Sequence, residues 1–212
     1  MADQRVSNLA QTLVNYCVEV REKDSVGIIA QPLATPLVQE VVREVLRRGG
    51  YPYLLPYKVP LPTLGYEGLD RIIFEEANDD QLKHLDRYWE TLNKDFEVRI
   101  FILSEFNTQG IKDIDPERIK IHKQANKPIF DTYFERMSSG DLRRVSTLFP
   151  TQAYADDAGM SLKDFEDYVY GATFSDSDDP VGEWKKMKAD QQHLVDWLKG
   201  KKQVEVRGPH VE

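Results

Sequence analysis

The sequence predicts an α/β fold: a three-layer sandwich with a mostly parallel sheet of about four to five strands and helices on both faces. Two observations predict it. Short apolar runs rich in β-branched residues alternate with longer segments whose apolar residues recur every three to four positions. Proline and glycine separate these segments at positions typical of helix starts, helix ends and turns. Strands that alternate with helices form parallel sheets covered on both sides.

The first part of the chain alternates helix and strand. The opening helix places apolar residues at helical spacing, namely Val6, Leu9, Ala10, Leu13, Cys17 and Val20. Residues 25–30 form a short apolar run that predicts a buried strand. We expect Thr35 to cap the next helix, with Pro36 at its first position and Gly49 at its end. The expected core stripe of that helix is Leu37, Val38, Val41, Val42, Val45 and Leu46.

The middle of the chain predicts three further strands. Residues 51–57 are expected to form a strand that Pro52 and Pro56 place at an edge of the sheet or interrupt. A helix beginning at Pro116 is expected to break at Pro128 into two pieces. The other expected elements are a loop at 58–69, a short helix near 70–77, a longer helix at about 80–94, and strands at 96–103 and 142–149.

From residue 151 onward the pattern is mostly helical. Ser161 and Asp164 have the form of a capping box, and Met160 and Phe165 are placed to pack around it. Asp179 is expected to cap the last helix, whose predicted inward residues are Val181, Trp184, Met187, Leu194, Val195 and Leu198. Residues 203–207 predict a fifth strand. A terminal strand needs a neighbour, which hints that the chain is part of a longer protein.

Composition fits one soluble globular domain over residues 1–212. Apolar residues make up 41% and charged residues 30%, and the net charge of −8 comes without a basic stripe. This balance argues against nucleic acid and anionic membranes as partners. No segment approaches the ~18 apolar residues of a membrane span. We expect a cytoplasmic protein, with the single cysteine, Cys17, as a buried structural thiol.

The common nucleotide and hydrolase motifs are missing. The turn after the first strand, residues 29–35, contains no glycine that would let the backbone approach a pyrophosphate. The sequence contains neither a P-loop nor the G-x-S-x-G pattern of a serine nucleophile.

Candidate metal ligands also have structural interpretations. The four histidines, His84, His122, His193 and His210, form no i, i+4 ligand pair. Asp176, Asp178 and Asp179 resemble oxygen ligands, but Val181 and Met187 stand where a calcium loop needs Gly and Glu. We expect this acidic cluster to cap a helix.

The aromatic stripe at 165–174 is typical of core and interface. Tyr168 and Tyr170 in it could bring hydroxyls to a cleft, but the sequence does not select that role over burial. We therefore predict no catalytic and no metal-binding residue within 1–212. Substrate-binding residues cannot be assigned from the sequence.

One long segment carries a specific resemblance. Residues 147–151, 153–155, 158–162 and 165–170, followed by Asp179, Pro180, Val181 and Trp184, closely resemble the thermophilic metallo-aminopeptidases (aminopeptidases T, S and II). Earlier segments agree, among them Asp115 to Arg118 and Gly140 to Arg143. The resemblance covers nearly the whole chain.

The resemblance implies an exopeptidase that removes amino-terminal residues from peptides with two divalent metal ions, such as zinc or cobalt. In such a site the metals polarise the scissile carbonyl and activate a bridging water. Family members are considerably longer, homodimeric, and hold their metal ligands in a carboxy-terminal domain beyond the strand expected near residue 203. No metal is therefore expected in residues 1–212, which correspond to the amino-terminal domain.

Three functional readings follow. The leading hypothesis is the amino-terminal, non-catalytic domain of a dimetal aminopeptidase, which helps to shape the substrate cavity and the assembly. The alternative is a stand-alone α/β binding or assembly module without peptidase activity, which the reading frame after Glu212 would distinguish. A third reading is a small-molecule-binding domain with its pocket at the carboxyl ends of the strands.

Overall fold

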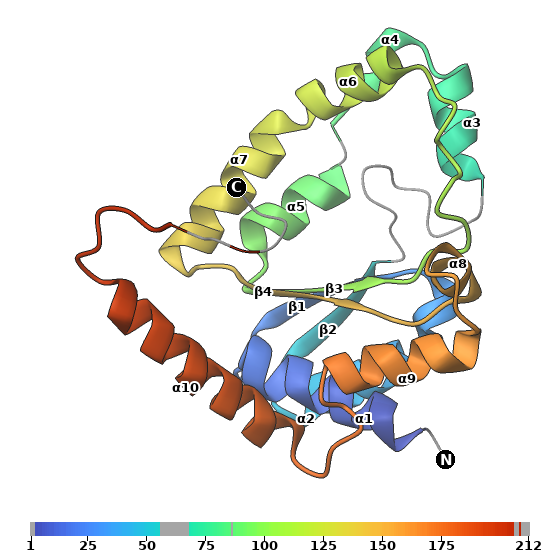
Figure 1. The fold of residues 1–212 in the computed structure, drawn as a ribbon. Helices are drawn as coiled ribbons and strands as arrows, with labels where there is room; N and C mark the ends of the chain where they lie inside the picture. The colour runs from blue at the N-terminus through green and yellow to red at the C-terminus, as the bar shows by residue number, and fades with distance from the viewer. Residues whose placement is uncertain (1–2, 56–67, 86, 206–207, 209–212) are drawn as a thin grey trace.

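The computed structural model describes residues 3–55, 68–85, 87–205 and 208, and Figure 1 traces the chain. Its centre is a parallel sheet. The strands are β1 Ser25–Ala30, β2 Tyr51–Leu55, β3 Val98–Leu103 and β4 Arg143–Leu148, in the order β2-β1-β3-β4. Every pair is parallel. The predicted α/β class is confirmed, as is the edge position of β2.

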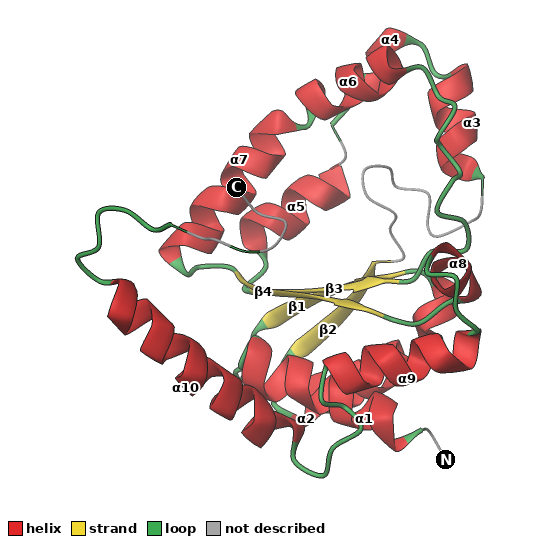
Figure 2. Ribbon diagram, viewed as in Figure 1, coloured by secondary structure: helices red, strands yellow, loops and turns green. Residues whose placement is uncertain are grey.

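Helices cover both faces of this sheet, as Figure 2 shows. On one face lie α1 Gln4–Gln11, α2 Thr35–Arg47, α9 Leu162–Ala172 and α10 Pro180–Leu198. On the other lie α5 Arg87–Asp95 and α7 Lys127–Ser139. The remaining helical segments are η1 Thr12–Cys17 (π-helical), η2 Pro32–Ala34 (3₁₀), α3 Leu69–Glu76, α4 Asp79–Leu82, α6 Pro116–Ala125 and α8 Gln152–Asp157. The three-layer arrangement is confirmed.

Three apolar clusters explain this arrangement. The largest joins α1 and α2 to the sheet and includes Ile28, Val41 and Ile100, all fully buried. A second packs Trp89 and Leu92 of α5 against Ile29 of β1 on the opposite face. A third, away from the sheet, unites α3, α4 and α6. Its buried members are Phe74, Leu82 and Ile114.

The predicted helix at 80–94 is two helices. Asn78 and Gln81 form a reciprocal capping box that starts α4, which ends at Leu82. Leu82 packs in the cluster away from the sheet, whereas Trp89 of α5 packs on the sheet. One straight helix cannot serve both cores, so the chain separates between them. The predicted break at Pro128 is confirmed, because α6 ends at Ala125 and α7 begins at Lys127.

The opening helix changes its hydrogen-bonding period. After α1 the chain forms the π-helical segment η1, in which Val18 N–H donates to the carbonyl of Leu13, five residues back. Val18 therefore takes the inward place that α-helical spacing assigns to Cys17. Val18 is 1% exposed, whereas Cys17 is exposed. The prediction of a buried cysteine is wrong for this reason.

Two expectations about α2 are also corrected. Thr35 is the first helical residue rather than the cap, and its hydroxyl donates to the carbonyl of Pro32 at 2.5 Å. The turn η2 directly precedes the helix, and its last residue, Ala34, stands at the cap position without a side-chain hydrogen bond. Leu37, Val41 and Val45 face the core as predicted, but Leu46 is 58% exposed because it lies beyond the edge of that stripe.

The carboxy-terminal elements depart most from expectation. Asp179 caps α10 as predicted. None of the residues of α10 is buried, however, and Leu194 and Val195 are exposed. Ser161 caps α9 as predicted, because its hydroxyl oxygen accepts the backbone N–H of Asp164. The Asp164 carboxylate accepts from the Ser161 hydroxyl, so the reciprocal half of a capping box is replaced by this side-chain contact.

The expected fifth strand is absent from the part that can be described, residues 203–205, which pair with no strand. Residues 206 and 207 lie outside the described residues. So do residues 56 and 57 of the expected second strand, and 58–67 of the expected loop.

Candidate functional site

The carboxyl ends of the strands meet where the chain changes direction across the sheet. From β1 the chain passes through α2 to β2 on one side, and later returns through α5 to β3 on the other. In open parallel sheets this switch point is the usual place for a ligand. Here Gln31 follows β1 and Ser104 follows β3. The backbone N–H of Gln31 donates to the hydroxyl of Ser104 at 3.2 Å, and both residues are buried.

A cavity of about 250 Å³ opens beside this point. It lies between the ends of β1 and β2, the turn η2 and the first turns of α2. Its lining residues are Ile28, Ala30, Gln31, Pro32, Thr35, Val38, Leu54 and Leu55. None of them carries a charge, so the walls are apolar apart from Gln31 and Thr35. This is the location expected for the pocket of a small-molecule-binding domain. None of these residues is predicted from the sequence to form a site.

The carboxamide of Gln31 is the distinctive polar group of this cavity. The residue is 6% exposed. Within the described residues its side-chain amide makes no hydrogen bond, and the amide is not sealed from solvent. A buried polar group without a protein partner needs one from water or a ligand. The hydroxyl of Thr35, by contrast, donates to Pro32.

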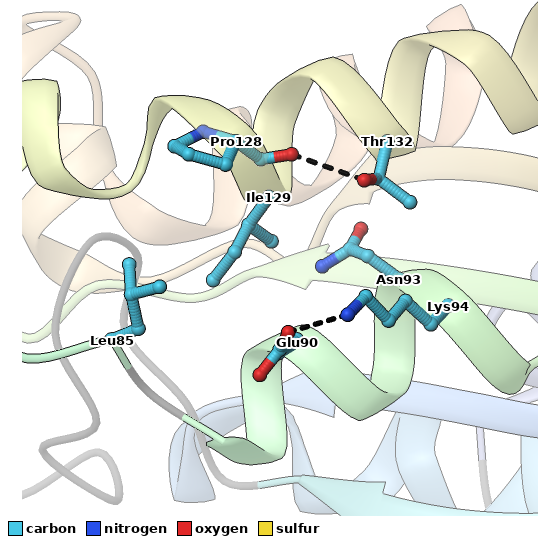
Figure 3. A pocket seen from close by; sticks show the side chains of 7 residues that line it. All are labelled: Leu85, Glu90, Asn93, Lys94, Pro128, Ile129 and Thr132. Atoms are coloured by element: carbon cyan, nitrogen blue, oxygen red, sulfur yellow. Dashed lines mark hydrogen bonds and ion pairs between the residues drawn. The ribbon is translucent and has the colours of Figure 1, made fainter.

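A second, smaller cavity of about 100 Å³ lies between α5 and α7 (Figure 3). Its polar groups are already engaged. Lys94 pairs with Glu90 at 2.5 Å, and the Thr132 hydroxyl donates to the Pro128 carbonyl at 3.1 Å. Buried Asn93 donates to the Trp89 carbonyl and accepts from the Arg99 guanidinium. Three of these contacts lie within α5 or α7, and the contact between Arg99 and Asn93 joins β3 to α5, so these polar groups are engaged inside the domain.

The histidines are dispersed in the structure. His84 is exposed in the connection between α4 and α5, outside the helix expected for it, and His193 is exposed on α10. His122 is buried in α6, with Nδ1 3.0 Å from the carbonyl of Leu82 and the Asn126 amide close to its ring. His210 lies outside the described residues. Across the ranges that can be described, no three His, Cys, Asp or Glu side chains gather in a way that could hold a metal ion.

The acidic cluster has a structural role. Asp179 accepts the backbone N–H of Gly182 at 2.9 Å and caps α10, while Asp176 and Asp178 are exposed. The capping interpretation is therefore confirmed for Asp179. Although Cys17 as a residue is exposed, neighbouring atoms desolvate its sulfur, and this raises the pKa of the thiol and favours its protonated form.

The two tyrosines of α9 have different environments. Tyr168 is 64% exposed, whereas Tyr170 is 3% exposed. The guanidinium of Arg5 lies 4.6 Å from the centre of the Tyr170 ring. Burial raises the pKa of Tyr170 to about 12, so its hydroxyl stays protonated. The two side chains do not form one cleft, and Tyr170 serves the contact between α1 and α9.

The comparison with protein families settles the relationship. The sequence model described as thermophilic metalloprotease (M29) matches residues 2–211. The chain belongs to this metalloprotease family. The resemblance stated from the sequence is thereby confirmed, and with it the relation to metal-dependent peptidases. Among curated proteins no sequence matches.

The fold of this M29 chain is also that of a solved relative. Wild-type AmpT from Thermus thermophilus superposes with a TM-score of 0.62 and 14% sequence identity. The match covers 80% of the M29 chain and 42% of the AmpT chain, so the chain spans less than half the length of this relative. In the described residues, no helix has the length and apolar character needed to cross a bilayer.

The described residues do not fit the metal centre that the family implies. Their His, Cys, Asp and Glu side chains supply no cluster for one ion, still less for two. Two of these side chains, His122 and Asp179, form hydrogen bonds within the domain. We therefore derive no catalytic step through a metal for these residues.

Proposed function

We propose that this chain is the amino-terminal, non-catalytic part of a dimetal aminopeptidase that removes amino-terminal residues from peptides. The observation that carries the proposal is the family match over residues 2–211, combined with a fold likeness that covers 42% of a longer solved chain. A segment that matches less than half of a relative fits one part of a larger enzyme. In this account two divalent ions, zinc or cobalt, are bound by residues outside 1–212.

The domain's own role in this account is to wall the substrate cavity and support assembly. The far half of α10 favours such a role, because Leu194, Val195 and Trp197 are 57%, 49% and 63% exposed. Apolar side chains clustered on one helix are typical of surfaces that another element covers. The proposal includes a homodimer of the full-length protein in the cytoplasm, with peptides as substrates. It includes neither a nucleic acid nor a membrane as partner.

Hydrolysis of aminoacyl-arylamides tests this proposal. The purified 212-residue protein, supplied with zinc or cobalt, is expected to release no more arylamine than a chelator-treated sample. A protein extended by any coding sequence that continues in frame beyond Glu212 is the matched comparison, and is expected to be active. Metal-dependent turnover by residues 1–212 alone would contradict the non-catalytic role.

A further inference from the structure

The cavity beside Gln31 has the chemistry of a binding site. Gln31 is held in place by its backbone, because its N–H donates to Ser104 and its carbonyl accepts from Ala34 at 3.0 Å. The side-chain carboxamide is therefore presented from a fixed point at the carboxyl end of β1. It offers two donors and one acceptor at a wall that is otherwise mostly apolar.

The lining excludes several ligand classes. Among the described residues, no cation lines the cavity to pair with a phosphate or carboxylate, and no anion lines it to pair with an ammonium group. Transfer of an unpaired charge into such surroundings is strongly unfavourable, so these walls favour a neutral ligand. The walls formed by the described residues also contain no aromatic ring on which a nucleobase could stack.

The size and polarity select a neutral ligand. An apolar cavity of about 150 Å³ accommodates benzene, so the 250 Å³ here can hold a ring or branched chain together with one polar group. A carboxamide pairs best with another amide, because each supplies both a donor and an acceptor. Val38, Leu54 and Leu55 then contact the apolar part.

We propose that this cavity binds a neutral amide that carries an apolar group, the chemistry of an internal apolar residue in a peptide. The free amino-terminal residue of a substrate does not fit, because its ammonium group would lie unpaired against apolar walls. The identification of the ligand as a peptide rests on the proposed aminopeptidase function. In that enzyme the cavity would hold a residue downstream of the one removed.

Binding is measured directly on the 212-residue protein, without any catalysis. N-acetyl-phenylalaninamide is titrated into ¹⁵N-labelled protein and followed by NMR, with free phenylalanine as the charged control. We expect shifts of the Gln31 side-chain amide and of the Leu54 and Leu55 backbone amides, with a Kd on the order of 1 mM for so small a ligand. Free phenylalanine is expected to shift none of them.

Two variants and one control locate the site. Val38→Trp fills the cavity and should abolish binding, whereas Leu46→Trp, on the exposed side of the same helix, should leave it unchanged. Gln31→Leu keeps the side chain's size but removes the hydrogen bonds, and should weaken binding about tenfold. If Val38→Trp fails to fold, Gln31→Leu alone carries the comparison.

The outcomes are distinct. Tighter binding of a blocked tripeptide than of the single amide assigns the site to peptides, and equal binding assigns it to small neutral amides. The proposal is overturned if no shifts occur at Gln31, if Val38→Trp binds as well as the parent, or if free phenylalanine binds equally. Failure of the aminopeptidase proposal would show in hydrolysis assays and would leave these shifts unaffected.

Discussion

Arg143, the first residue of β4, fastens the edge strand to the amino-terminal segment. Its guanidinium donates to the carbonyls of Val18 and Glu19 and to the carboxylate of Asp24, at 2.9, 2.6 and 2.7 Å. The side chains of Asp24 and Arg143 are only 9% and 20% exposed. The loss of one partner would leave the other charge poorly solvated.

Asp24→Ala is therefore expected to lower the free energy of unfolding by about 2 kcal/mol. Lys120→Ala, which removes an ion pair whose partners are 56% and 70% exposed, should change it by less than about 0.5 kcal/mol. Urea denaturation of the two variants makes the comparison. Equal effects would show that the Asp24 pair is no stronger than a surface pair.

Tyr170 predicts a loss of stability at alkaline pH. Burial, with help from Glu166 and Asp3, raises the pKa of Tyr170 from 10.0 to about 12, against the opposing effect of Arg5. Because the folded protein holds this proton more tightly than the unfolded chain, the stabilisation is complete below pH 10. It is lost as pH rises from about 10 to about 12.

The parent should therefore lose about 2–3 kcal/mol more than Tyr170→Phe between these limits. Tyr168→Phe, which alters an exposed ring on the same helix, should behave like the parent. Urea denaturation at a series of alkaline pH values provides the measurement. A Tyr170→Phe protein with the same alkaline slope as the parent would rule out this origin.

At the residue scale, the roles of some side chains can be predicted from the sequence and those of others cannot. Asp179 is recognisable as a cap because Pro180 follows it and favours a helix start. Gln31 is not recognisable as a site residue, because a polar residue after a strand is ordinary. The available signal is its place directly after a predominantly apolar strand and before Pro32. Only the structure shows that its side-chain amide makes no hydrogen bond to the residues that can be described.

At the scale of elements, Gly27 sets how closely α5 approaches β1. A methyl group at Gly27 would overlap the side chain of Leu92. Gly27→Ala is thus expected to cost about 1–3 kcal/mol of unfolding free energy through overpacking. In Gly27→Ala/Leu92→Ala the added methyl gains space, so the double variant should lose less than the sum of the two single losses.

Gly110→Ala provides the control, since a methyl there meets only ordinary contacts at 3.9 Å. Thermal or urea denaturation of the parent, the two single variants and the double variant gives the coupling free energy between positions 27 and 92. Strict additivity of Gly27→Ala and Leu92→Ala would contradict close packing as the reason for this glycine.

The two ends of α10 should respond differently to substitution. The indole of Trp184 donates to the carbonyl of Thr173 at 3.1 Å and meets the ring of Phe174 edge-on, whereas Leu194 is 57% exposed. Trp184→Ala should cost about 2 kcal/mol, and Leu194→Ala less than about 0.5 kcal/mol. Circular dichroism during denaturation measures both. A large loss for Leu194→Ala would mean that this half is packed in the isolated chain.

This difference also shows that the spacing of apolar residues does not predict which element covers a helix face. The pattern of α10 predicts an inward apolar face, but none of its residues is buried. The same pattern arises whether the covering element lies within these residues or elsewhere. Similarly, the switch to π-helical bonding in η1 leaves no sequence signature, so Cys17 was assigned to the wrong face. Helix and strand types follow from local spacing, whereas the partner of each face depends on tertiary packing.

For the whole molecule, the alternation of strands and helices was sufficient to predict a parallel sheet covered on both faces. It could not predict the separate cluster of Phe74, Leu82 and Ile114, because buried residues in two cores have the same local spacing. Nor could it decide the fifth strand, whose pairing depends on a neighbour. The family relationship came from one specific segment, residues 147–184, and the family match over residues 2–211 confirms it.

The measurement that tests the central claim most directly is the metal content and affinity of the 212-residue protein. Elemental analysis after dialysis is combined with calorimetric titration of zinc and cobalt. If residues 1–212 form a non-catalytic part of a dimetal aminopeptidase, no ion binds tightly in stoichiometric amount. Tight binding of one or two ions per chain would contradict the account and place a metal site within these residues, with Asp176, Asp178 and Asp179 as the first ligands to substitute.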